Sequence, residues 1–143
     1  MIITFVEEIM VKYGLEKELI ENDAVLKDKL SQAKDAQERV FFKFTYSKEI
    51  DNYEKQNIPI DIPSVRLREV IEKLIDKKIT IDNLPTVIQE NLKISPETSK
   101  KISEEILNND EIMNELNSNE TIPAEEQKEE PKKTKSIGYE LLK

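Results

Sequence analysis

No histidine and no cysteine occur among the 143 residues of this chain. The lack of histidine removes the side chain that most readily transfers protons near neutral pH. The lack of both residue types excludes a structural zinc site, an iron–sulfur cluster and a disulfide. Catalysis would have to rest on Asp, Glu, Lys, Ser, Thr or Tyr alone. We therefore predict that the protein is not an enzyme and that it has no catalytic residues.

Glycine is almost absent as well. The two glycines, Gly14 and Gly138, lie 124 positions apart (138 − 14). A phosphate-binding loop needs clustered glycines so that backbone N–H groups can approach the ligand. The acidic residues do not follow the twelve-residue spacing of a calcium loop either. The sequence thus predicts no cofactor and no metal.

Charge and hydropathy limit the partners. Lys and Arg number 22 against 30 Asp and Glu, a net charge of −8, which disfavours attraction to nucleic acid and to anionic membranes. No stretch approaches the roughly 20 apolar residues that span a bilayer. We predict a protein without membrane contact that resides in the cytoplasm, a location that agrees with the lack of cysteine.

The apolar spacing predicts an all-α bundle of about five to six helices. A first helix should end at Gly14, and a second should run from Leu15 to Leu30 unless Asn22 and Asp23 break it. In residues 39–46 the alternation of apolar side chains is typical of a strand, but a lone strand has nothing to pair with. We interpret this stretch as part of one long helix from Asp35 to Lys55.

Further helices are predicted beyond the proline-containing connector 57–63. Ser64 should cap the clearest of them, and a short helix should begin at Asp82 or Asn83. Ser95-Pro96-Glu97 signals another start, and the segment around Ile112 to Leu116 should extend that helix. The apolar faces of these helices comprise Leu67, Val70, Ile71, Leu74 and Ile75, then Leu84, Val87, Ile88 and Leu92, then Ile102, Ile106 and Leu107.

The chain divides by composition into three parts. Residues 1–116 form the helical domain, with N-terminal helices in 1–56 and a second helical segment in 64–116. Residues 117–135 have too few apolar side chains to offset the entropy of ordering and are predicted to be a disordered linker. Apolar residues return in 136–143, where we predict a tethered peptide that binds a partner, folds back onto its own domain or is a tail without a role. Its anchors would be Ile137, Tyr139, Leu141 and Leu142.

Residues 87–106 have the outline of a helix-turn-helix. The run from Leu92 to Thr98 resembles the turn and the recognition-helix start of LuxR-type regulators, which implies that Glu97, Lys100 and Lys101 would face DNA. The nucleic-acid alternative would use Lys93, Lys100 and Lys101. However, Lys93 replaces the usual glycine, Ser99 replaces an apolar residue, and the same helix is rich in acids. We favour two helices that pack in a bundle. Residues 64–108 are also similar to a three-helix segment of uncharacterised small helical proteins from candidate-phyla bacteria, a resemblance that implies a fold and no function.

The aromatic residues Phe41, Phe42, Phe44 and Tyr46 form either a partner-binding face or part of the core. Aromatic side chains are usually buried, which favours the core. We hypothesise a non-catalytic protein-interaction, scaffold or adaptor protein, or a small subunit of a larger assembly, whose partner is another protein. A homo-oligomer stays open, and the alternative is a nucleic-acid-binding regulator that uses residues 87–106.

Overall fold

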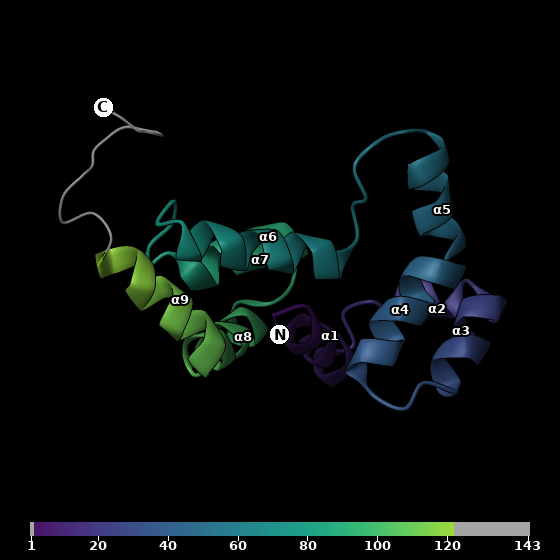
Figure 1. Ribbon diagram of the computed structural model, residues 1–143, viewed down its shortest axis with the longest axis horizontal. Coiled ribbons are helices and arrows are strands. Elements are labelled where there is room, and N and C mark those ends of the chain that lie inside the picture. The colour runs from purple at the N-terminus through teal and green to yellow at the C-terminus, as the bar shows by residue number, and fades with distance from the viewer. Residues whose placement is uncertain (1, 122–143) are drawn as a thin grey trace.

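The computed structural model describes residues 2–121 and contains, within that range, nine α-helices and no strand (Figure 1). The predicted all-α class is confirmed, whereas the predicted number of five to six helices is too low. The helices are α1 (Ile2–Tyr13), α2 (Lys17–Glu21), α3 (Ala24–Ser31), α4 (Ala36–Tyr46), α5 (Lys48–Lys55), α6 (Pro63–Ile75), α7 (Leu84–Leu92), α8 (Pro96–Leu107) and α9 (Asp110–Thr121).

Two polar caps account for most of the additional helices. Asp23 has an extended backbone, and its carboxylate accepts a hydrogen bond from the Leu26 N–H at 3.1 Å, which separates α2 from α3. Ser47 likewise ends α4 and caps α5 by accepting from the Ile50 N–H at 3.3 Å. Residues 39–46 are therefore helical, as predicted, but the single helix predicted from 35 to 55 is wrong. Side-chain caps of this kind satisfy amides at a helix start.

The helix starts and ends differ from prediction at two further places. Proline at the first position of α6 leaves Ile62 as its N-cap, so Ser64 lies inside the helix and does not cap it. The segment after Asn109 is a separate helix, because the Asn109 side chain accepts from the Ile112 N–H at 2.9 Å. This helix reaches Thr121 and so enters the segment predicted as linker. The rest of that segment lies outside the described residues.

The helices pack around two apolar clusters, with α1 and α4 near their junction (Figure 1). One cluster joins α1 to α6, α7, α8 and α9, and the other joins α2, α3 and α5 to the start of α6. Helix α6 contributes to both, through Leu67 to the first and Val65 to the second. None of the helices within residues 2–121 combines the length and the apolar character that crossing a lipid bilayer requires.

Candidate functional site

A lysine is buried where α1, α4 and α6 meet. The side chain of Lys43 is 1% exposed, and it is the one buried residue of α4. Burying a charge costs free energy unless the charge is paired and hydrogen-bonded. The residues around Lys43 therefore form a candidate site.

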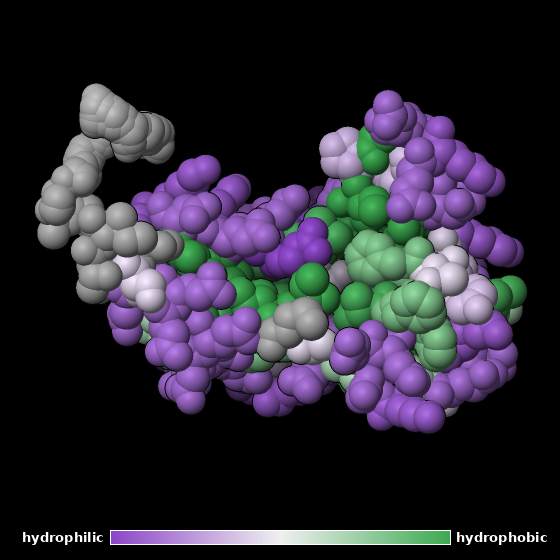
Figure 2. Space-filling model, in the orientation of Figure 1, coloured by the Kyte–Doolittle hydropathy of each residue, from purple (hydrophilic) through white to green (hydrophobic). Residues whose placement is uncertain are grey.

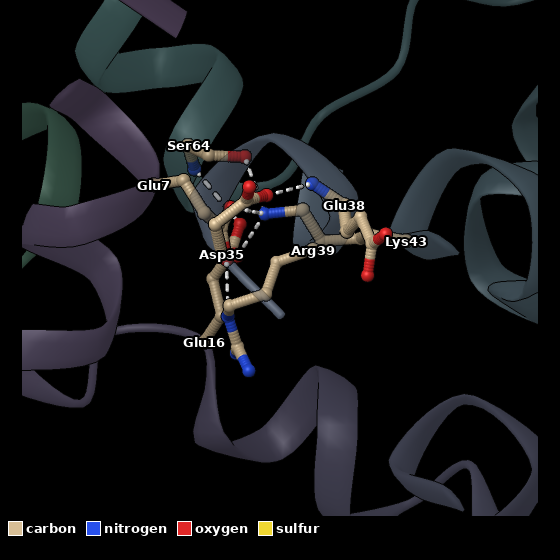
Figure 3. Close-up of polar contacts among 7 residues, drawn as sticks. All are labelled: Glu7, Glu16, Asp35, Glu38, Arg39, Lys43 and Ser64. Atoms are coloured by element: carbon tan, nitrogen blue, oxygen red, sulfur yellow. Dashed lines mark hydrogen bonds and ion pairs between the residues drawn. The ribbon is translucent and has the colours of Figure 1, made fainter. Parts of the chain in front are cut away.

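The ammonium of Lys43 has a partner for each of its three N–H donors (Figure 3). It donates to the Glu7 carboxylate, to Glu16 Oε1 at 2.6 Å and to Ser64 Oγ at 3.3 Å. These residues come from α1, the turn after α1, and the first turn of α6. One cation thus joins three segments that are distant in the sequence.

The two carboxylates around Lys43 are also fully engaged. Glu16 Oε2 accepts from the Ser64 N–H at 2.9 Å, which satisfies one of the amides at the start of α6. Glu7 Oε2 accepts from Arg39 Nε at 3.2 Å. Two acids and two bases cancel in charge, and we call Glu7, Glu16, Arg39 and Lys43 the buried quartet. Both carboxylates and the Lys43 ammonium are bound to one another, to Arg39 or to Ser64, which is the geometry of a structural ion-pair network.

The sequence analysis missed the buried quartet. Glu7 lies between Val6 and Met10 on the buried side of α1, and Lys43 lies between two phenylalanines. The signal in the sequence that could indicate these buried charges is a charged residue within each of these two apolar stretches.

A hollow of about 150 Å³ adjoins the buried quartet. Its lining is apolar at Met10, Val11 and Ile20, with ionisable groups from Lys17 and three members of the quartet. Both carboxylates in this lining are already bound to cations or to a backbone N–H. No group of three or more potential metal ligands occurs among the residues that the structure describes.

A second polar contact ties α1 to α8. The Tyr13 hydroxyl donates to the Glu105 carboxylate, and the Lys12 ammonium lies 2.9 Å from Glu105 Oε2. The hydrogen bond to Glu105 raises the pKa of Tyr13. Burial acts to raise the pKa of Glu105, but the hydrogen bonds from Tyr13 and Lys12 outweigh it and lower that pKa.

The predicted aromatic residues divide between core and surface. Phe42 and Phe44 are half-buried against the second apolar cluster, whereas Phe41 is 63% exposed and Tyr46 is 36% exposed. The ring of Phe42 lies 5.9 Å from that of Phe41 and 6.1 Å from that of Tyr46. The favoured core interpretation is therefore wrong for Phe41 and Tyr46, because Lys43, and not an aromatic residue, occupies the innermost position of α4.

A small hollow reaches Glu7 and Lys43 of the buried quartet, and its lining includes Val40, the neighbour of Phe41 on α4. Ile3, Val40, Phe44 and Val65 line it, together with Glu7, Lys43, Ser64 and Arg68. Its volume is only about 20 Å³, which is room for about one water molecule. We define the apolar face as Ile3, Val40, Phe41, Phe44 and Val65. Figure 2 shows apolar side chains gathered on the side of the molecule where α1, α4 and α6 meet.

The residues predicted at DNA lie on the surface of the other half of the molecule. Lys93 ends α7 in the left-handed region, at φ 56°, a backbone conformation that favours glycine. Lys100 and Lys101 are exposed on α8, and Lys101 Nζ lies 3.8 Å from Glu97 Oε2. Ser99 is fully buried, and its hydroxyl donates to the Ser95 carbonyl at 2.9 Å.

The remaining predicted site residues, Ile137, Tyr139, Leu141 and Leu142, lie outside the described residues. Comparison of the chain with models of protein families, with curated proteins and with solved structures finds no match. The two resemblances noted from the sequence therefore rest on sequence alone. Function has to be argued from the site itself.

Proposed function

We propose that the protein is a non-catalytic interaction or scaffold protein that binds a partner protein through the apolar face. The observation that carries this proposal is the exposure of Phe41, at 63%, beside a hollow lined by Ile3, Val40 and Phe44. Contiguous apolar surface of this kind marks interaction sites in soluble proteins. Partner binding would cover it.

The energetics favour Phe41 as the main anchor. Full burial of a phenylalanine side chain is worth about 1.5–3 kcal/mol relative to its exposure. Aromatic side chains are enriched at interface centres, where a few residues contribute most of the binding free energy. Half-buried Phe44 and Val40, on the same side of α4, would extend the contact without needing to move.

The buried quartet supports this function by fixing the platform. Lys43 lies on α4 between Phe42 and Phe44, and its three hydrogen bonds hold α4 against α1 and α6. A binding surface on rigid elements loses less conformational entropy when the partner binds. The buried quartet therefore acts as a positioning device for the apolar face.

Affinity purification from the native cell tests the proposal. We expect tagged wild-type protein to retain a partner that Phe41→Ser loses. The matched control is Ile81→Ser, which removes a similarly exposed apolar side chain, at 46%, from the segment between α6 and α7. Both variants should keep the wild-type circular dichroism spectrum. Identical sets of bound proteins for wild type and both variants would contradict the proposal.

The alternative, a nucleic-acid-binding regulator, draws support from the turn between α7 and α8. Lys93 adopts the left-handed conformation there, and Ser95 caps α8 by accepting from the Thr98 N–H at 3.1 Å. Glu97 and Glu104 are exposed on the same helix as Lys100 and Lys101, so the surface is not net basic. A phosphate-binding helix should be net basic, and we therefore rank this function second.

A further inference from the structure

We propose that the chain's own segment 136–143, Ser136-Ile-Gly-Tyr-Glu-Leu-Leu-Lys143, docks in cis on the apolar face with Glu140 paired to Arg68. This inference rests on the proposed function, because it takes the same face as the binding surface. It names an occupant of that face and a way to regulate partner binding, since a partner protein would have to displace the segment. Segment 136–143 is therefore a built-in competitor.

Charge complementarity selects this occupant. Arg68 lines the hollow and forms no ion pair with any residue of the described range 2–121. The other charged groups of the lining, Glu7 and Lys43, are bound to each other. The hollow thus presents apolar side chains and one available cation. A fitting ligand is an apolar segment with one carboxylate, and Glu140 is the single acid of residues 136–143.

The connecting chain is long enough. Lys77, just past the end of α6, donates to the Leu116 carbonyl of α9 at 3.2 Å, so the C-terminal parts of these helices adjoin. At a rise of about 1.5 Å per residue, Arg68 lies about 14 Å along α6 from Lys77, and Thr121 about 8 Å along α9 from Leu116. With the helix-to-helix separation of about 8–10 Å, the path from Thr121 to Arg68 is about 30 Å.

Ile137 follows Thr121 by 16 residues (137 − 121). An extended chain covers about 3.3–3.6 Å per residue, so these residues can span about 50 Å. The reach exceeds the path to Arg68 with room for slack. Tethering gives the segment an effective concentration of about a millimolar at the face, so weak contacts suffice for docking in cis.

Spin labelling tests the docking directly. The chain has no cysteine, so Lys143→Cys introduces a single attachment site for a nitroxide. In the isotope-labelled full chain, we expect the nitroxide to broaden the NMR signals of Val40, Phe44 and Val65. The control carries the same label with Leu141→Ser and Leu142→Ser, and it should lose the broadening.

A second sample distinguishes docking within one chain from docking on another copy. It mixes chains that carry only the nitroxide with chains that carry only the isotope label. Docking in cis predicts no broadening in the mixture. Broadening there would show that the segment reaches a second copy, and it would overturn the proposal. Absence of broadening in the full chain that carries both the nitroxide and the isotope label would overturn it as well.

A peptide titration tests the Arg68 contact. The synthetic peptide SIGYELLK is added to a chain that ends at Thr134, and the signals of Val65 and Phe44 are followed. We expect saturable shifts in the shortened chain and at least about tenfold weaker apparent binding in the full chain, whose own segment competes. Arg68→Glu should weaken the peptide about fivefold, and a peptide with Glu140→Lys should recover that loss.

The two proposals fail in different ways. Partner capture that depends on Phe41, without docking of segment 136–143, overturns this inference and leaves the proposed function standing. If segment 136–143 docks but no partner protein depends on Phe41, the proposed function is overturned and this inference stands. If both proposals hold, the chain that ends at Thr134 should retain more partner protein than the full chain. Equal retention would overturn the claim that segment 136–143 competes with the partner.

Discussion

The Nζ of Lys43 lies 2.6 Å from Glu16 Oε1, and both side chains are almost fully removed from solvent. The second oxygen of that carboxylate accepts from the Ser64 N–H at the start of α6. Glu16 thus acts at once as the counter-ion of α4 and as a helix cap supplied from a distant part of the chain. Together with the direct hydrogen bond from Lys43 to Ser64 Oγ, this carboxylate holds α4 against α6.

Removal of the ammonium should destabilise the protein strongly. Lys43→Met keeps most of the side-chain volume but leaves Glu7 and Glu16 buried without their shared cation. Breaking a buried ion pair in this way costs about 3–5 kcal/mol. We expect a loss of this size in the free energy of unfolding, measured by urea denaturation at pH 7.

A surface pair provides the control for Lys43→Met. Lys27 Nζ lies 2.8 Å from Glu21 Oε1, with both side chains 58% exposed. Lys27→Met should change the free energy of unfolding by less than about 1 kcal/mol, because solvent screens an exposed pair. Equal effects of the two substitutions would contradict the account of the buried quartet.

Asp23 should make stability depend on pH in the acid range. Its carboxylate accepts from the Leu26 N–H at 3.1 Å and from the Lys48 N–H at 2.8 Å, at the starts of α3 and α5. Burial acts to raise the pKa of Asp23, but the hydrogen bonds from Lys48 and Leu26 outweigh it and lower the pKa below the ordinary 3.8. The folded state therefore favours the ionised form.

The sign of the effect follows from that lowered pKa. The contribution of ionised Asp23 is complete above pH 3.8 and is lost as the pH falls through the lower folded-state value. Asp23→Asn should reduce the free energy of unfolding at pH 7, and the gap to wild type should close with acidification. Urea titrations of both proteins at several pH values test this, and a gap that stays constant would contradict it.

Lys93 is held in a backbone conformation that favours glycine. Its φ is 56°, and a side chain in this region costs about 1–2 kcal/mol. Lys93→Gly should raise the free energy of unfolding by up to about 1 kcal/mol, because greater entropy of the unfolded chain offsets part of the gain. Lys100→Gly, inside α8, should instead lower it by about 1 kcal/mol. Loss of stability in both variants would refute the argument.

Sequence periodicity predicted the helix faces well because each depends on neighbouring residues only. The stripe Leu67, Val70, Ile71, Leu74 and Ile75 is buried along its whole length in α6. The break at Asp23 agrees with the alternative stated for Asn22 and Asp23, whereas the break at Ser47 is not predicted. A polar residue such as Ser47 can lie within a continuous helix or cap a new one, and tertiary packing decides between the two.

The buried quartet could not be predicted in the same way. Lys43 is separated from Glu7 by 36 positions and from Ser64 by 21. No local period reports which charges meet across such distances. The exposure of Phe41 and the burial of Lys43 likewise depend on how α4 is rotated against α1. The sequence therefore identifies the aromatic cluster but does not show that Phe41 and Tyr46 are its exposed members.

The regulator hypothesis predicts salt-dependent DNA binding that needs the α8 lysines. We expect none from the wild-type chain at 150 mM salt, about the physiological ionic strength, because exposed acids accompany Lys100 and Lys101 on α8. Fluorescence anisotropy with labelled duplex DNA measures this. Salt-sensitive binding by wild type that is abolished by Lys100→Glu with Lys101→Glu would reverse our ranking of the two functions.

Photo-crosslinking from the apolar face tests the central claim most directly. A benzophenone amino acid is incorporated in place of Phe41 in one chain and in place of Ile81 in another, and both are irradiated in the native cell. We predict a discrete crosslinked protein from position 41 that position 81 does not yield. No adduct from position 41, or the same adducts from both positions, would contradict the claim that this face binds a partner.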